Sequence, residues 1–99
     1  MIEISKKIEG NVVIEKDTNL RGMIVGNVEV LDGATLYLRG SLNGRLYIYE
    51  GAKVLLYGTN NGDVINDGGI LEVFGVINGR LFRERGRTLI DDNALVEEM

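Results

Sequence analysis

The stretch SLNGRLYIYEGAKVLLYG, Ser41 to Gly58, decides the fold, because it holds one complete unit of a repeat that fills the chain. Short apolar segments alternate in it with glycines, and the apolar residues within a segment lie two positions apart, as in a β-strand. The spacings of three and four that a helix needs are missing. The stretch therefore predicts three short strands separated by three glycine corners.

The same unit returns along the chain at intervals of 16, 18, 18 and 17 residues. The intervals are measured between the first-corner glycines, which are Gly10, Gly26, Gly44, Gly62 and Gly79. Two residues after each glycine stands an apolar residue, and this column contains Val12, Val28, Leu46, Val64 and Leu81. Because each strand resembles the strand one repeat later, like strands are expected to pair in parallel and stack in a coil.

The sequence therefore predicts a single all-β domain over residues 1–99, a parallel β-helix of about five rungs. The rungs are expected over residues 10–90. Residues 1–9 are interpreted as an incoming half-rung that forms an N-terminal cap. Residues 91–99, DDNALVEEM, are expected to form an N-cap followed by a short helical turn, as a C-terminal cap.

Glycine suits the corners because it adopts positive φ, and tolerates close contact between rungs, without steric cost. Asparagine precedes three corner glycines, at Asn43, Asn61 and Asn78, and is expected there in the left-handed conformation. Two further asparagines, Asn60 and Asn66, interrupt columns that are otherwise apolar. A satisfied polar corner or a local bulge is the favoured interpretation of both, and a ligand site is the alternative.

Composition excludes several classes of function. The 99 residues include no cysteine and no histidine, which excludes disulfides, thiolate metal sites and thiol nucleophiles. A general base would have to be a carboxylate, lysine or tyrosine. No Walker-type loop, zinc spacing or nucleophile elbow occurs, so we predict no enzyme activity, no catalytic or metal-binding residues and no cofactor.

The charge and the hydropathy pattern bear on partners and location. With 11 basic and 15 acidic residues the net charge is -4, which argues against nucleic acid as a partner. No apolar run has the length of a membrane span or a signal sequence. These features favour a soluble protein without an integral membrane segment, and the lack of cysteine fits the cytoplasm.

Two groups of charged residues are candidate binding sites. Asp32, Glu50 and Asp67 each precede a glycine of the second corner, where acidic residues are favoured in turns, and a calcium or sugar site is the weaker interpretation. The second group lies near the last rung, where a solvated edge is favoured over an anion site. It consists of Arg80, Arg83, Arg85 and Arg87.

Most of the aromatic side chains fall at positions that should point outward. A contiguous exposed apolar stripe is unusual in a monomer and indicates a surface that faces another protein. The alternative is that the rings only stabilise the strands by stacking across rungs. The predicted interface residues are Tyr37, Tyr47, Tyr49, Leu55, Tyr57, Ile65, Phe74 and Phe82.

The segments GNVEVLDGATLYLRGSLNGRLYIYEGAKVLLYGTNNGDV and FGVINGRL resemble the bactofilins, which are bacterial polymer-forming cytoskeletal proteins. The resemblance covers about Gly10 to Ile90. It implies a right-handed triangular β-helix that assembles end to end into nonpolar filaments without a nucleotide. The left-handed β-helices of hexapeptide acyltransferases fit less well, because they keep multiples of six residues and use a histidine base.

Two functions are therefore expected as alternatives. The first is a structural, self-associating β-helix that forms oligomers or filaments through its rung ends or an aromatic face. The second is a small protein-binding module, such as an inhibitor or antidote of another protein, that uses the exposed aromatic residues. The expected partner is accordingly a second copy of the chain or another protein.

Overall fold

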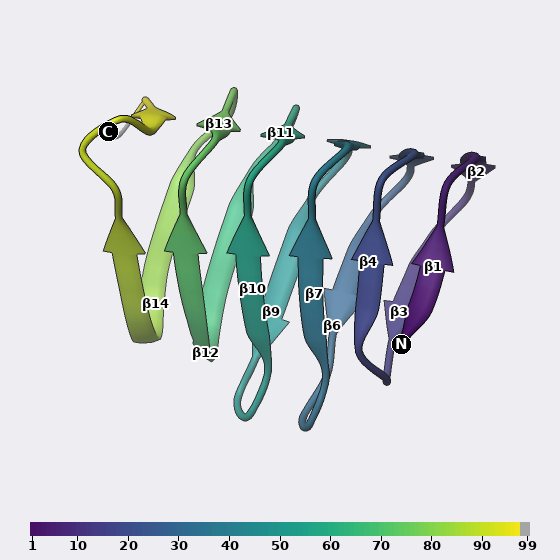
Figure 1. Cartoon of the computed structure of the whole chain (residues 1–99). Helices are drawn as coiled ribbons and strands as arrows, with labels where there is room; N and C mark the ends of the chain where they lie inside the picture. The colour runs from purple at the N-terminus through teal and green to yellow at the C-terminus, as the bar shows by residue number, and fades with distance from the viewer. Residues whose placement is uncertain (98–99) are drawn as a thin grey trace.

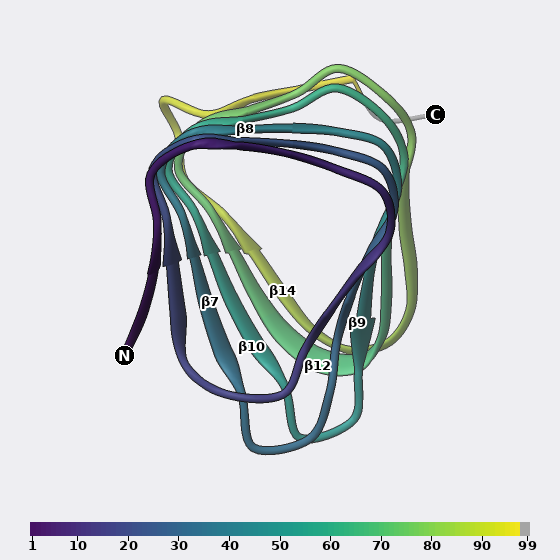
Figure 2. The ribbon, with the colours of Figure 1, turned by 90° about the vertical axis from the view of Figure 1, so that its right-hand side faces the viewer.

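The chain winds in about five turns, and each turn pairs in parallel with the turns before and after it (Figure 1). The computed structural model describes residues 1–97. In Figure 1 the chain rises along the front, crosses the top and descends behind while it advances from right to left, so the coil is right-handed. Viewed along its axis, the coil has a roughly triangular outline (Figure 2). The β-helix expected from the repeat is confirmed.

Three faces surround the core, and each gathers equivalent strands from successive turns. The first face contains β3 (Val12–Ile14), β6 (Val28–Val30), β9 (Leu46–Tyr49) and the first halves of β12 (Val64–Val73) and β14 (Leu81–Ile90). The second face contains β1 (Ile2–Ile4), β4 (Thr18–Leu20), β7 (Thr35–Leu38), β10 (Lys53–Leu56) and the second halves of β12 and β14. The third face contains β2 (Lys7–Glu9), β5 (Met23–Val25), β8 (Ser41–Asn43), β11 (Thr59–Asn60), β13 (Val76–Ile77) and β15 (Leu95–Val96).

The core consists of inward columns in which equivalent apolar residues lie one above another. Leu46 pairs in register with Val28 on one side and with Val64 on the other, and Val64 pairs in turn with Leu81. The first three are fully buried and Leu81 is nearly so. The stacking of this column, expected from the period-2 pattern, is confirmed, and it gives a short chain a continuous apolar interior.

The corner glycines serve two purposes. Gly33 has a φ of 85°, which a residue with a side chain rarely adopts. Gly44 has no positive φ, but a Cβ there would overlap the carbonyl oxygen of Gly26 in the preceding turn. Glycine is therefore required at the first corner by close packing of consecutive turns.

The expectation that asparagines occupy the left-handed region is wrong, because no residue other than glycine has a positive φ among those described. The asparagines form a side-chain ladder instead. Asn78 Nδ2 donates to Asn61 Oδ1 at 2.9 Å, and Asn61 Nδ2 donates to Asn43 Oδ1 at 2.8 Å. Their role is to join turns through side-chain amides, which equivalent positions in a stacked coil allow.

The last two turns pass the second corner differently from the earlier ones. Loops protrude at this corner between β6 and β7 and between β9 and β10, whereas β12 and β14 bend through it as continuous strands (Figures 1 and 2). The ladder between β12 and β14 shifts register on either side of Asp67. The local irregularity predicted near Asn66 is thus present.

Both terminal segments continue the ladders. Ile2–Ile4 pairs with Thr18–Leu20, as expected for an incoming half-rung. The helical turn expected within residues 91–99 is wrong for the described residues, because Asp91 to Asn93 form a tight turn and β15 then pairs with β13. Asp91 Oδ2 accepts the backbone N–H of Asn93 at 3.0 Å, so the predicted capping aspartate starts a turn and not a helix. Residues 98 and 99 of that prediction lie outside the described part of the chain.

Candidate interaction surfaces

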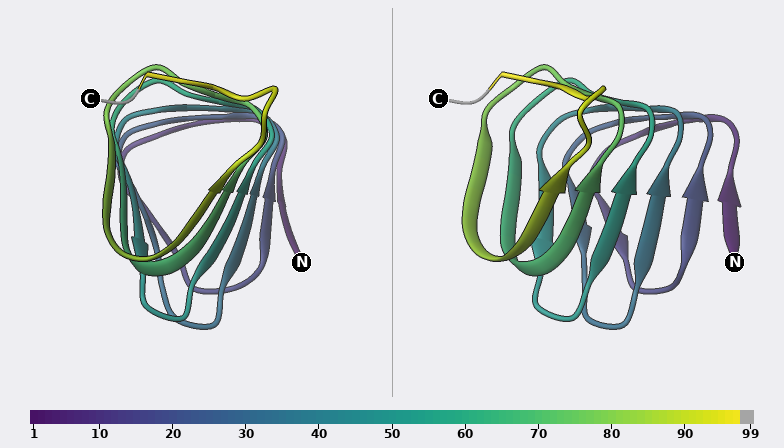
Figure 3. Two further views of the ribbon diagram at one scale, coloured as in Figure 1. Left: turned by 90° about the vertical axis from the view of Figure 1, so that its left-hand side faces the viewer. Right: turned by 60° about the vertical axis from the view of Figure 1, so that its left-hand side comes forward.

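The eight predicted interface residues lie on two different faces of the coil. Tyr37, Leu55, Tyr57 and Phe74 belong to the second face, and Tyr47, Tyr49, Ile65 and Phe82 belong to the first. The residues lie at outward positions, as predicted, but the expectation that they form one contiguous stripe is wrong. The second corner separates the two groups, because the chain changes direction there (Figure 3).

On the second face, three side chains from successive turns stack into one column. The guanidinium of Arg39 lies 4.7 Å from the ring centroid of Tyr57, a cation–π distance. The ring of Tyr57 lies 5.1 Å from that of Phe74, with 10° between the planes. Both rings remain well exposed, at 41% and 38%. This column therefore presents aromatic surface to solvent.

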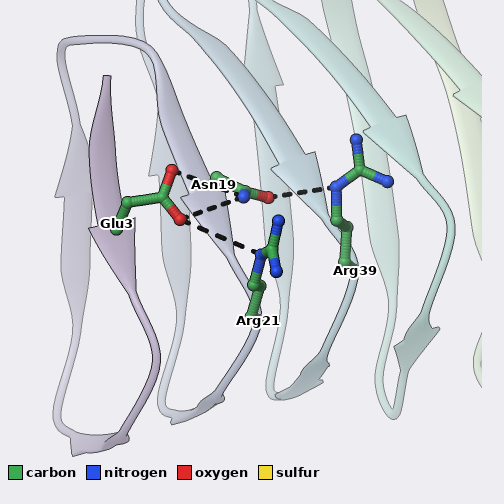
Figure 4. Close-up of polar contacts among 4 residues, drawn as sticks. All are labelled: Glu3, Asn19, Arg21 and Arg39. Carbon is green, nitrogen blue, oxygen red and sulfur yellow. Dashed lines mark hydrogen bonds and ion pairs between the residues drawn. The ribbon is translucent and has the colours of Figure 1, made fainter.

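A polar ladder continues the column toward the N-terminal end of the second face (Figure 4). Arg39 Nε donates to Asn19 Oδ1 at 3.2 Å, and Asn19 Nδ2 donates to Glu3 Oε1 at 3.1 Å. Arg21 Nε lies 3.9 Å from the same carboxylate. Asn19 thus fixes the guanidinium of Arg39 from one side while Tyr57 supports it from the other. This ladder is not predictable from the repeat, because Asn19 and Arg39 are 20 residues apart and occupy different columns.

The first face carries the other aromatic group, which is tied to charged residues. Tyr49 Oη donates to Glu29 Oε2 at 2.8 Å. This hydrogen bond to a carboxylate is the main cause that raises the pKa of the Tyr49 phenol above its ordinary value. The rings of Tyr47 and Tyr49 lie 6.4 Å apart and nearly parallel.

Charged pairs link the last two turns of the first face. The carboxylate of Asp63 accepts the backbone N–H of Arg80 at 2.9 Å, and this bond is the main cause that lowers the pKa of Asp63. The guanidinium of Arg80 lies 5.4 Å from the ring centroid of Phe82. Arg85 Nε pairs with Asp67 Oδ1 at 2.9 Å. Arg80 and Arg85 of the predicted basic edge are thus exposed and paired with acidic residues of the preceding turn.

A shallow hollow of about 310 Å³ lies between these charged pairs and the aromatic rings. Its floor includes Ile65, which is smaller than the rings on the turns before and after it, Tyr47 and Phe82. The lining residues are Arg45, Tyr47, Asp63, Ile65, Arg80, Phe82 and Glu84. Among residues 1–97, no three acidic side chains come together as a set of metal ligands, so the calcium interpretation of Asp32, Glu50 and Asp67 gains no support.

The two asparagines that interrupt apolar columns, Asn60 and Asn66, differ in how well their side chains are hydrogen-bonded. Asn66 Nδ2 donates to Arg87 O and Thr88 Oγ1, both at 3.0 Å, and Asn66 Oδ1 accepts the N–H of Gly69 at 2.9 Å. Asn66 is therefore a satisfied polar corner, as the favoured interpretation predicted. Asn60 Nδ2 donates to Gly62 O at 2.8 Å, but its Oδ1 has no partner. Hydrogen bonds therefore account for the burial of the Asn66 side chain but not for the burial of Asn60 Oδ1.

Comparison with protein-family models, with curated proteins and with solved structures finds no match to this chain. Within residues 1–97, no helix has the length and the apolar character needed to cross a membrane.

Proposed function

We propose that this chain is a non-enzymatic structural protein that self-associates through the ends of its coil, in the manner implied by the resemblance of its repeat to the bactofilins. The observation that supports the proposal is that core-facing apolar side chains at both described ends are only partly covered. A second copy placed on either end would bury them.

The apolar cross-section is complete inside the coil and open at its ends. One inward column contains Leu20, Leu38 and Leu56, which are fully excluded from solvent. Ile4 lies at the N-terminal end of the same column and is only partly buried. The C-terminal end repeats the pattern. Its partly buried core residues are Ile90, Ala94 and Val96.

The backbone at the ends adds a second, directional driving force. Among the described residues, β1, β2 and β3 each pair with one neighbouring strand only, and so do β14 and β15. An unpaired strand edge is a template for another strand. In Figures 2 and 3 no described segment lies across either end of the coil, so these edges are accessible to a second copy.

Sedimentation over a range of protein concentrations, combined with electron microscopy, tests the proposal. A carboxylate introduced at an inward end position, by Ile4→Glu or Val96→Glu, should shorten the assemblies, because end contact would desolvate the charge. Thr59→Glu is the matched control, since Thr59 points outward from β11, which is paired on both sides. Assemblies that keep their length in both end variants would contradict end association.

The hollow on the first face favours a second candidate, a module that binds another protein. Its rings and paired charges resemble the aromatic and arginine-rich composition of protein interfaces. This alternative expects one small species at all concentrations, and it expects Tyr47→Ser with Phe82→Ser to abolish partner binding without unfolding. In either case we propose that the protein acts in the cytoplasm.

A further inference from the structure

Three outward columns cover the second face, and their residues follow the ladder register of its strands. The leading column, nearest the second corner, contains Asp17, Thr35, Lys53, Ile70 and Arg87. The middle column contains Glu3, Asn19, Tyr37, Leu55, Glu72 and Leu89. The trailing column, nearest the third face, contains Arg21, Arg39, Tyr57, Phe74 and Asp91.

The leading and trailing columns complement each other turn by turn. The first turn pairs an acid with a base, Asp17 with Arg21, and the last described turn pairs Arg87 with Asp91. Between them come a polar match of Thr35 with Arg39, a cation–aromatic match of Lys53 with Tyr57, and an apolar match of Ile70 with Phe74. Thr35 and Lys53 are half-buried, and the other members of the two columns are exposed.

These matches cannot form within one molecule, where Arg21 instead lies 3.9 Å from Glu3 and Asp17 Oδ1 accepts the N–H of Thr35 at 2.9 Å. The two members of each match stand four residues apart on one turn, so their backbones are roughly 13 Å apart along the strand. Side chains that point outward from a flat strand do not bridge such a distance. A two-fold axis parallel to the coil axis would lay the leading column of one copy on the trailing column of another, and the middle column on itself.

We propose that the second face binds the second face of a second copy, with the two coils side by side and their axes parallel. Ion pairs of Asp17 with Arg21 and of Arg87 with Asp91 then close the interface at its two ends. The pairing buries exposed apolar surface at the centre, where Ile70 is 41% and Phe74 38% exposed.

The middle column fits the same arrangement. Leu55 meets Leu55 of the second copy, and Leu89, which is 44% exposed, meets Leu89. Glu72 also meets its own equivalent, but the ammonium of Lys53 lies 3.7 Å from its carboxylate and offsets the repulsion. The self-contacts on the axis are therefore aromatic or apolar at Tyr37, Leu55 and Leu89, and the Glu3 carboxylates that also meet there each lie 3.9 Å from Arg21 of their own chain.

An antiparallel arrangement of the same faces fits less well. A two-fold axis along the strands through Leu55 would place Lys53 against Lys53 and Ile70 against Thr35. It would also place the exposed Leu89 against Asn19. The exposed apolar residues of the second face lie in its later turns, and when the two faces overlap over their full length only parallel axes bring those turns of both copies together.

The contact is small, so the dimer is expected to be weak and sensitive to salt. The face is roughly 13 Å wide and about 24 Å long from the strand spacings, well under the area of a standard interface of about 800 Å² per partner. Association weaker than micromolar is expected, and exposed ion pairs weaken as salt rises. The pairing does not depend on end association.

A charge-swap cycle tests the register by sedimentation equilibrium at low salt. Arg21→Asp alone should weaken dimerisation about tenfold, because it replaces two attractions with two repulsions. Adding Asp17→Arg should restore the dimer, since every exchanged pair again has opposite charges. Adding Asp91→Arg instead should not restore it. Rescue by Asp91→Arg and not by Asp17→Arg would overturn the parallel arrangement.

Cross-linking gives a second test that does not depend on the charge variants folding. The chain has no cysteine, so a single introduced cysteine reports one position. With a short bis-maleimide reagent, Leu89→Cys should give a covalent dimer efficiently, because position 89 faces itself only when the axes are parallel. Val76→Cys on the third face is the matched control. Equal cross-linking yields from Leu89→Cys and Val76→Cys would overturn the proposal. So would an unmodified chain that stays monomeric at every concentration. Neither result depends on the end variants.

Discussion

Replacing the buried Asn60 with leucine should make the protein more stable. Asn60 is fully buried, and its neighbours in the column, Leu42 and Ile77, are apolar. Its Oδ1 has no hydrogen-bond partner, and its Nδ2 makes one good bond, to Gly62 O at 2.8 Å. Leucine has a similar size and would continue the apolar column.

The expected gain follows from opposing effects of known size. Removing a buried acceptor without a partner recovers about 1–3 kcal/mol, and losing one hydrogen bond costs about 0.5–1.5 kcal/mol. The added apolar burial contributes in the same direction as the first effect, while imperfect fit of the branched side chain reduces the sum. We expect Asn60→Leu to raise the free energy of unfolding by about 1–2 kcal/mol, or the melting temperature by roughly 5–15 °C.

Asn66→Leu is the matched comparison, and it should have the opposite effect. Leucine there would leave the buried N–H of Gly69 without its acceptor and would remove two further hydrogen bonds. The expected loss is about 2–4 kcal/mol. Thermal and urea unfolding, followed by far-ultraviolet circular dichroism, measures both variants.

The opposite signs are the test of the reasoning. The loss of one hydrogen bond costs about 1 kcal/mol. If Asn60→Leu lowers the free energy of unfolding by that amount or more, then Oδ1 of Asn60 is hydrogen-bonded in solution and the argument from its missing partner fails. If the two variants change stability equally, burial alone would explain both asparagines.

Three further predictions concern single positions. Gly44→Ala should destabilise the protein by several kcal/mol or prevent folding, because the added Cβ would overlap backbone of the preceding turn; thermal unfolding measures it. The raised pKa of Tyr49 means that its bond to Glu29 stabilises the fold below about pH 10 and that this contribution is lost as pH rises further, so Tyr49→Phe should flatten the alkaline fall in stability. The lowered pKa of Asp63 means that its contact with Arg80 stabilises the fold above about pH 4 and is lost on acidification, so Asp63→Asn should flatten the acid limb of the same unfolding measurement.

The repeat made the inward columns predictable, because inward positions bury an apolar side chain at nearly every turn, with Asn60 and Asn66 among the exceptions. The register of Val28, Leu46 and Val64 followed from their spacing alone. The final turn was predicted less well: a helical turn was expected after Asp91, where β15 forms instead, because backbone pairing with β13 outweighs the local capping signal. Local pattern does not report such tertiary pairing.

For the candidate surfaces, the sequence predicts which residues share an outward column but not which columns share a face. Outward position follows from alternation, but the face on which a column lies depends on where the corners turn, so Tyr47 and Tyr57 were combined although a corner divides them. The ladder of Glu3, Asn19 and Arg39 was missed because its members differ in residue type, and only the stacked turns bring them together.

The division between inward and outward columns also separates stability from association. Inward residues such as Leu46 are fully buried, so changes there act on folding. Outward residues such as Arg21 contribute little to the core, and exposed substitutions usually change stability by less than about 0.5 kcal/mol. Arg21→Asp can therefore alter self-association while the melting temperature stays nearly constant, whereas Asp17→Arg also removes the hydrogen bond from Thr35 N–H to Asp17 Oδ1 and should lower the melting temperature. If association and melting temperature instead fell together in every second-face variant, the face would act through folding, and its complementary columns would have no role between copies.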